Sequence, residues 1–259
     1  MTNDKSVEIT SHTNRRYREL ISLHGSRGIR RTGYALVPGT RFVKSFLEHA
    51  PDQCRAMILR SGDQLLIEHS GLERIVLTPS LFRALDRWGC GPPILKIAVP
   101  PFPEWHENVW PEGCTLVLPL QDPKNMGAAL RCAAAFGVQN VVITRESAHP
   151  YHPDAIRASA AVLTHLKIYS VSESFVSNPW PAPFFALHTS GTRLASFYWP
   201  RAFGLVLGME GPGIPCDMDI SEYISIPMEP GIESLNATAA LAIVLYQWHM
   251  HATVWGDIR

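Results

Sequence analysis

The residues best suited to chemistry lie in three loops of the C-terminal half, each at the end of an expected strand. Residues 122–137 read DPKNMGAALRCAAAFG, which predicts Asn125 as a helix N-cap and puts Arg131 about two turns into that helix. A helix N-terminus with an arginine on the same helix is well suited to bind a phosphate group. Ligands of open α/β sheets bind beyond the carboxyl ends of the strands, so this loop is a candidate binding site.

The other two loops carry weaker signals when each is taken alone. Residues 207–213 read LGMEGPG, where three glycines free the backbone and Glu210 is the only charged residue. Such glycines form a turn more often than a cofactor site. Residues 226–240 read IPMEPGIESLNATAA and place Ser234 and Asn236 at the start of a long helix, where simple capping would explain both.

The elements that must position these loops form an α/β pattern. Residues 115–120 predict a strand, 126–136 a helix stopped by Gly137, and 140–144 the next strand, so a parallel sheet is expected. Further strands are expected at 184–187, 202–207 and 223–226. The helix expected at 234–254 is apolar on more than one face, which indicates burial by the core and by a second subunit.

The N-terminal half predicts a smaller α/β domain. An amphipathic helix is expected over residues 14–24, helices at 41–49 and 80–88, and strands at 34–37, 56–59, 74–77 and 94–99. Residues 1–13 show no pattern and predict a frayed terminus. Four prolines in residues 99–113 indicate a linker. The predicted organisation is a domain at 14–100, a linker at 101–112 and a second domain at 113–259.

Charge is distributed unevenly although the net charge is zero. Residues 1–112 carry 15 Lys and Arg against 12 Asp and Glu, whereas residues 113–259 carry 8 against 11. Six arginines fall between Arg15 and Arg31 with a single acid, Glu19. Arginine at this density usually meets phosphate, although a solvated helix face followed by a basic loop explains the run equally well.

Composition excludes several classes of protein. The chain is 46% hydrophobic without an apolar run of the roughly 20 residues that a membrane helix needs, and its N-terminus lacks the apolar core of a secretory signal. Five cysteines without a C-x-x-C pair favour reduced thiols, so we expect a cytoplasmic protein. The histidines of HPYHP and HMH lack carboxylate or cysteine neighbours, and no metal site is expected. The linker aromatics, among them Trp105 and Trp110, favour packing over base stacking.

Together and in this order, the three loops resemble the three motifs of the SpoU (TrmH) family within the SPOUT class of S-adenosylmethionine-dependent RNA methyltransferases. The first motif, D-P-x-N-x-G-x-x-x-R-x-A-x-x-F-G, fits residues 122–137 throughout. The second, G-x-E-x-x-G, fits residues 208–213, and the third, I-P-M followed by S-L-N, fits residues 226–228 and 234–236. Residues 18–48 resemble more loosely the RNA-binding domain, similar to ribosomal proteins, that is often fused ahead of this catalytic domain.

The resemblance implies a trefoil-knotted, parallel-sheet α/β domain that forms a homodimer and methylates a ribose 2′-hydroxyl of tRNA or rRNA. It implies that S-adenosylmethionine is held largely by backbone at Leu187, Gly208, Ile226, Pro227, Met228 and Leu235. The family's invariant polar positions correspond to Asn125, Arg131, Glu210, Ser234 and Asn236. The basic residues expected to bind RNA are Arg15, Arg16, Arg27, Arg30, Arg31 and Arg41.

Elementary chemistry restricts the roles of the polar set. The pKa of an arginine lies above about 12, so Arg131 is better suited to holding an RNA phosphate and stabilising a developing alkoxide than to acting as a base. We expect Asn125 to orient Arg131 or the ribose, and Ser234 with Asn236 to anchor the third motif. Glu210 fits either of two roles, positioning the loops or meeting the partner subunit.

Some positions depart from the family pattern, and other functions compete with the leading one. Ala237 and Thr238 stand where members commonly show V-S, and Pro38 stands where they often carry Glu, which points to a different RNA target. A non-catalytic ribosome-assembly factor could keep this fold, and methylation that confers antibiotic resistance would use the same architecture. A dinucleotide-dependent oxidoreductase fits poorly because no G-x-G-x-x-G follows the first strand of the C-terminal domain.

Overall fold

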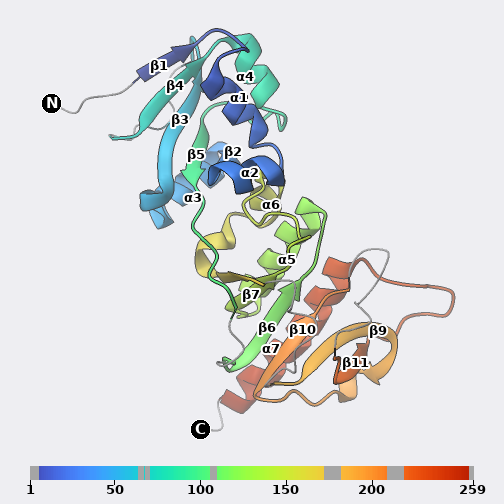
Figure 1. The fold of residues 1–259 in the computed structure, drawn as a ribbon. Coiled ribbons are helices and arrows are strands. Elements are labelled where there is room, and N and C mark those ends of the chain that lie inside the picture. The colour runs from blue at the N-terminus through green and yellow to red at the C-terminus, as the bar shows by residue number, and fades with distance from the viewer. Residues whose placement is uncertain are drawn as a thin grey trace. The chain divides into compact units, whose positions relative to one another are not determined.

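The computed structural model describes residues 6–63, 67, 71–105, 110–171, 182–208 and 219–256, with side chains up to residue 251 (Figure 1). Contacts divide the chain into two compact units. Unit 1 comprises Met1–Pro101 and His149–Thr164, and unit 2 comprises Phe102–Ala148 and His165–Arg259.

Unit 1 is built on a five-stranded mixed sheet. Its strands are β1 (Ser6–Ile9), β2 (Tyr34–Pro38), β3 (Cys54–Arg60), β4 (Glu73–Leu77) and β5 (Ile94–Ala98), in the order β1-β4-β3-β5-β2. Strands β1, β4 and β3 pair in parallel, and β5 runs antiparallel to both β3 and β2. The helices are α1 (Arg15–Ser22), α2 (Ser26–Thr32), α3 (Thr40–His49), α4 (Pro79–Leu85) and α6 (Pro153–Ala158), with a 3-10 turn at Pro51–Gln53.

Helix α1 forms where the amphipathic pattern predicts it. The Asn14 side chain caps it by accepting from the backbone N–H groups of Arg16 and Tyr17. Its apolar face packs into the core of unit 1 through Tyr17 and Leu20, and the Tyr17 hydroxyl donates to the Leu81 carbonyl at 3.0 Å. The opposite face carries arginines, so both faces of the helix are defined by the sequence.

Two expectations for the N-terminal half are wrong. Residues 6–9 do not fray but form β1, which pairs with β4 in register from Ser6 and Arg74 onwards. The basic segment after Gly25 is not a loop but helix α2, which ends at Gly33 in a left-handed conformation. Both segments are too short for a periodic signal, and β1 depends on a partner strand far away in the sequence.

Unit 2 is built on a six-stranded, fully parallel sheet, which confirms the predicted α/β class. Its strands are β6 (Gly113–Leu118), β7 (Asn140–Ile143), β8 (Lys167–Ser170), β9 (Phe184–Arg193), β10 (Ala202–Val206) and β11 (Glu222–Ser225), in the order β11-β9-β10-β6-β7-β8. Helices α5 (Pro123–Ala135) and α7 (Ala237–Gly256) pack against each other, and a 3-10 turn lies at Leu194–Ser196. A further 3-10 turn, Val162–His165, lies at the boundary where the chain passes from unit 1 back to unit 2. The trefoil knot that the resemblance implies stays a prediction.

The core of unit 2 explains two sequence features. Gly204 of β10 lies so close to the Phe184 ring that a Cβ there would approach it to 2.5 Å, so a larger residue does not fit. Trp105 and Trp110 pack edge-on at 5.4 Å between ring centroids, and Trp105 also meets Tyr169 at 4.9 Å. These linker aromatics therefore serve as packing anchors.

Residues 149–164 follow β7 along the chain but belong to unit 1. Helix α6 packs against β2, and the Trp88 Nε1–H donates to Asp154 Oδ1 at 2.6 Å. The backbone N–H of His149 donates to Ser26 Oγ at 3.1 Å. The predicted division into consecutive ranges assigns residues 149–164 to the second domain, whereas their contacts place them in unit 1. Within the described ranges, no helix combines the length and the apolar character needed to cross a bilayer.

Candidate functional site

A pocket of about 200 Å³ in unit 2 collects segments that are far apart in the sequence. It is formed within β9, just beyond the ends of β10 and β11, and at the start of α7. Its lining consists of Leu187, His188, Thr189, Leu207, Gly208, Ile224, Ile226, Met228, Ser234, Leu235, Ala237 and Ala240. The position beyond the strand ends is the one expected for a ligand site in a parallel sheet.

An irregularity in β9 gives the pocket one of its walls. Strand β11 pairs with β9 at Ala186, and then shifts between Tyr223 and Ile224 to pair with Thr192, so residues 187–191 leave the ladder. Gly191 permits this bulge because a Cβ at that position would lie 2.4 Å from the Tyr223 carbonyl oxygen. Residues 187–189 therefore do not pair in register with β11, and they contribute to the pocket lining.

The pocket wall is mostly apolar, with a few polar groups at its edge. Leucine, isoleucine and methionine side chains dominate, and the polar members are His188, Thr189 and Ser234. His188 Nδ1 accepts from the Ser190 N–H at 3.1 Å and lies 2.9 Å from the Ser190 hydroxyl. An apolar pocket with a few polar groups suits a ligand that combines a flat ring with polar ends.

Six of the residues predicted from the sequence lie in this pocket. They are Leu187, Gly208, Ile226, Met228 and Leu235 of the predicted cofactor set, and Ser234 of the predicted catalytic set. Pro227 is exposed and lies outside the lining. The sequence reasoning missed His188 and Thr189, because a polar pair inside a strand has no motif around it; only the bulge places it at the pocket.

Helix α5 carries Asn125 and Arg131, and neither residue lines the pocket. The predicted N-cap is wrong: Asp122 caps the helix, accepting at Oδ1 from Lys124 N at 2.6 Å and from Asn125 N at 3.0 Å. Pro123 follows as the first helical residue, where a missing N–H costs nothing. Asn125 is thus half-buried in the first turn, and Arg131 is exposed further along.

Asn236 has the structural role that the sequence left open. Its Oδ1 accepts from the backbone N–H groups of Thr238 at 3.0 Å and Ala239 at 3.4 Å, so it caps α7. Glu210, the remaining predicted polar residue, lies outside the described residues.

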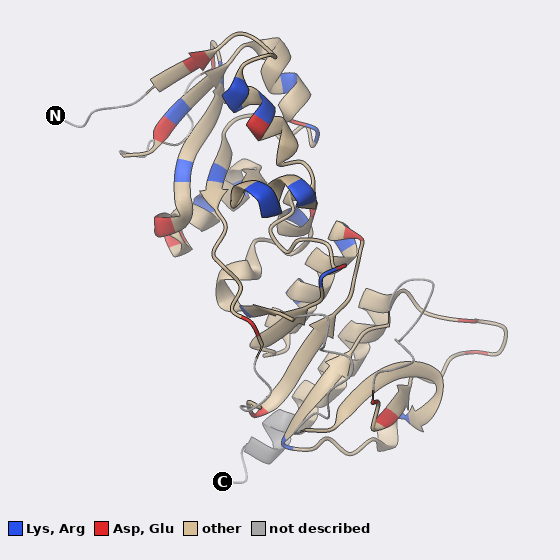
Figure 2. Cartoon of the chain, in the orientation of Figure 1, with Lys and Arg blue, Asp and Glu red and all other residues tan. Residues whose placement is uncertain are grey.

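The predicted RNA-binding arginines all belong to unit 1, where they are not equivalent. Arg15 and Arg31 line a hollow of about 380 Å³ together with Arg18. Arg16 instead bonds Glu73. Arg27, Arg30 and Arg41 are exposed. Figure 2 shows basic residues on both α1 and α2.

The histidines of HPYHP are used within unit 1. The buried His149 ring accepts at Nδ1 from the Tyr151 N–H at 3.1 Å. Burial, with a contribution from the charges of Arg30 and His152, lowers the pKa of His149 to about 3. His152 Nδ1 accepts from the Asp154 N–H at 3.2 Å and so caps α6. In the described part of the chain, no group of three or more His, Cys, Asp and Glu side chains is arranged to hold a metal ion.

Comparison with known proteins gives a family match that covers half of the chain. The model of the SpoU rRNA methylase family matches residues 115–246. A ribosomal RNA small subunit methyltransferase of Syntrophobacter fumaroxidans is 38% identical over 93% of this chain, which spans only 49% of that protein. The chain therefore covers about half the length of that relative.

Two further proteins resemble the chain over most of both lengths. A 23S rRNA (guanosine-2′-O-)-methyltransferase of Pseudomonas aeruginosa is 26% identical, with 82% of this chain and 94% of that protein aligned. The crystal structure of a SpoU methyltransferase from Streptomyces viridochromogenes in complex with AdoMet matches with a TM-score of 0.75 at 22% identity. That match covers 93% of this chain and 98% of the other, and shows a shared fold.

Proposed function

Because the chain belongs to the SpoU rRNA methylase family, we propose that it transfers the methyl group of S-adenosylmethionine to a ribose 2′-hydroxyl of rRNA or tRNA. The observation that carries this proposal is the pocket of unit 2, in which Gly208 of the second motif lies together with residues of the third motif. The Pseudomonas aeruginosa relative, a 2′-O-methyltransferase by name, supports the choice of the ribose oxygen.

The pocket fits S-adenosylmethionine by the chemistry of its lining. Leu187, Ile226 and Leu235 offer apolar surface for the adenine ring. The backbone of residues 187–189 and 208 follows the last paired residues of β9 and β10, Ala186 and Val206, and would hydrogen-bond polar groups of the cofactor. Ser234 and His188 add polar side chains at the edge. When bound, the cofactor supplies an electrophilic methyl group on its sulfonium.

The chain's own residues must hold the RNA and lower the cost of ionising the ribose hydroxyl. We assign Arg131 to a phosphate near the target nucleotide and to the negative charge that develops on the 2′-oxygen. Asn125, two turns before it on the same helix, would orient the guanidinium or the ribose. Ser234 would hold the third motif in place, and Asn236 supports it by capping α7.

The exposed face of α7 supports a homodimer formed through unit 2. Ile243, Tyr246 and Met250 lie on one side of the helix and are 42%, 52% and 43% exposed. An apolar stripe of this kind on a helix is covered most simply by the same stripe of a second copy.

We also propose a cytoplasmic location. The four cysteines within the described ranges are free thiols, as is usual in a reducing compartment, and the proposed RNA substrates are made and modified there.

The test is methyl transfer from radiolabelled S-adenosylmethionine into total tRNA and, separately, rRNA from a strain that lacks this gene. Nuclease mapping of the label should yield a 2′-O-methyl nucleotide and thereby name the substrate. If neither pool is labelled and calorimetry detects no binding of S-adenosylmethionine, the non-catalytic RNA-binding function replaces the proposal.

A further inference from the structure

The two N-terminal helices of unit 1 enclose a hollow of about 380 Å³. It is lined by Arg15, Arg18 and Glu19 of α1 and by Arg31 and Thr32 of α2. Arg15 and Arg18 lie three positions apart and therefore share one face of α1. All three arginines are exposed, and Figure 2 shows blue segments of the ribbon on both helices.

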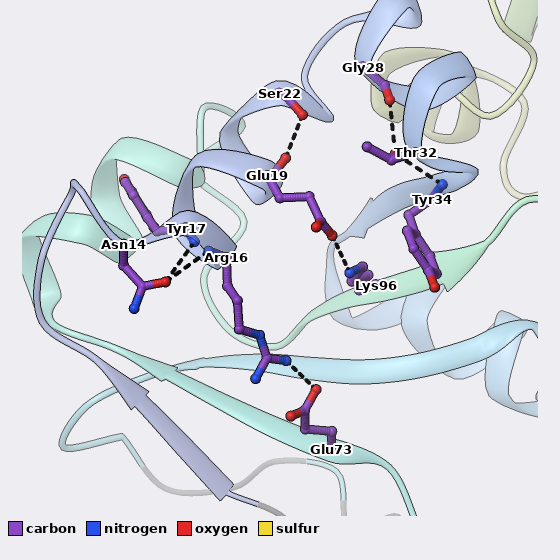
Figure 3. Close-up of polar contacts among 10 residues, drawn as sticks. All are labelled: Asn14, Arg16, Tyr17, Glu19, Ser22, Gly28, Thr32, Tyr34, Glu73 and Lys96. Atoms are coloured by element: carbon purple, nitrogen blue, oxygen red, sulfur yellow. Dashed lines mark hydrogen bonds and ion pairs between the residues drawn. The ribbon is translucent and has the colours of Figure 1, made fainter.

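The one acid in the lining is already neutralised. Glu19 Oε1 accepts from Lys96 Nζ at 2.6 Å, as Figure 3 shows, and the Lys96 side chain is only 14% exposed. The ammonium group of Lys96 also lies 4.0 Å from the centroid of the Tyr34 ring, which fixes its position. Glu19 therefore does not compete for the arginines, and the hollow keeps three positive charges.

The neighbouring arginine has a different task. Arg16 is one residue on from Arg15, so its side chain leaves the helix in another direction and donates to Glu73 on β4 (Figure 3). The hydrogen bond to Glu73 raises the pKa of Arg16 above its ordinary value. By contrast, within the residues that the structure describes, Arg15, Arg18 and Arg31 form no ion pair.

We propose that Arg15, Arg18 and Arg31 bind backbone phosphates of RNA in the α1–α2 hollow, whereas Arg16 serves the fold. The identity of the ligand rests on the proposed function; the assignment of the site goes beyond it. Guanidinium groups match phosphate oxygens with paired N–H donors. The Thr32 hydroxyl is already used, donating to the Gly28 carbonyl at 2.8 Å, so the arginines carry the recognition. Such contacts position RNA without reading its sequence.

The experiment measures binding of a short fluorescein-labelled RNA hairpin by anisotropy over a range of salt concentrations. The triple variant Arg15→Gln, Arg18→Gln, Arg31→Gln should reduce the slope of log Kd against log salt by about 2 to 3, because each lost phosphate contact removes roughly 0.7–0.9. Its affinity at moderate salt should fall at least about tenfold. The corresponding triple lysine variant keeps the charges and should retain most of the slope.

Arg16→Gln is the matched control, since it removes one charge from the same helix. It should lower the Tm of unit 1 and leave the salt slope close to that of the wild type. The proposal is overturned if the folded triple variant keeps the salt slope of the wild type. It is also overturned if Arg16→Gln reduces the slope by as much as each substitution of the triple variant does on average.

The outcomes separate this inference from the proposed function. If the wild type labels RNA with methyl groups and the triple variant binds the hairpin equally well, only the phosphate site is wrong. If the triple variant loses the salt slope but the wild type transfers no methyl group to any RNA pool, the phosphate site stands and the proposed activity fails.

Discussion

Arg131 projects from α5 into solvent, whereas Met126, Leu130 and Ala133 of the same helix are buried. Its side chain therefore lies outside the buried face of α5 and is available to a substrate. We predict that Arg131→Ala lowers methyl transfer at least about 100-fold, the usual loss for a group that stabilises developing charge. Cofactor affinity, measured by calorimetry, should change little because Arg131 is outside the pocket lining.

Lys124→Ala is a suitable control for that variant, because Lys124 is also an exposed cation on α5. It should retain nearly full activity. Substantial turnover by Arg131→Ala would remove Arg131 from the mechanism.

His149 makes the stability of unit 1 depend on pH. Its pKa is lowered to about 3 in the folded state, against about 6.5 in the unfolded state. As the pH falls, His149 is therefore protonated in the unfolded chain before it is protonated in the folded protein. This contribution is fully present above pH 6.5 and is lost progressively as the pH falls from about 6.5 toward about 3. At pH 5 the loss is on the order of 2 kcal/mol.

The corresponding measurement is urea unfolding between pH 7 and about pH 5. His149→Asn keeps an acceptor for the Tyr151 N–H but cannot be protonated, so its free energy of unfolding should vary less with pH than that of the wild type. Equal pH slopes for the two proteins would show that His149 is not the responsible group.

Among the secondary-structure elements, α7 allows a structural role of its capping residue Asn236 to be distinguished from a catalytic role by two variants. Asn236→Ala removes the acceptor for two N–H groups and should cost about 1 kcal/mol of stability. Asn236→Ser keeps a good capping oxygen and should restore that stability. If Asn236→Ser is stable and inactive, the residue acts in catalysis; if it is stable and active, capping is its whole contribution.

The bulge in β9 is a second feature of this kind, because it requires glycine at position 191. Gly191→Ala would push a methyl group against the Tyr223 carbonyl, and should cost about 1–3 kcal/mol and weaken binding of S-adenosylmethionine by displacing residues 187–189. Thermal unfolding and calorimetry measure the two effects. Gly25→Ala, at the N-cap of α2 in unit 1 where nothing lies within 4 Å of the added Cβ, should leave binding of S-adenosylmethionine unchanged, and a similar loss of binding there would argue against the bulge as the cause.

At the scale of the whole molecule, the apolar stripe on α7 predicts self-association. Tyr246→Glu should convert a dimer into a monomer in sedimentation velocity, because it places a charge where the stripe would be buried. Tyr198→Glu, at an aromatic residue that is 81% exposed, should leave the dimer intact. A monomeric wild type, or a Tyr246→Glu variant that still dimerises, would contradict the homodimer.

Most of the elements and the family can be predicted from local patterns in the sequence. The βαβ pattern of β6, α5 and β7, the amphipathic α1 and the long α7 follow from periodicity within short windows, because helix and strand formation depend on neighbours a few residues apart. The functional role of the residues around Ser234 follows from their resemblance to the family's third motif, and the structure places Ser234 in one pocket with Gly208 of the second motif.

The tertiary structure sets which side chains meet. It paired β1 with β4, opened the bulge at residues 187–191, and attached residues 149–164 to unit 1. It also separated Arg16, bonded to Glu73, from Arg15, which faces the hollow, although the two are adjacent in sequence. The physical reason is that a side chain's partner is set by strand pairing and packing between distant segments, which no local pattern of residues contains.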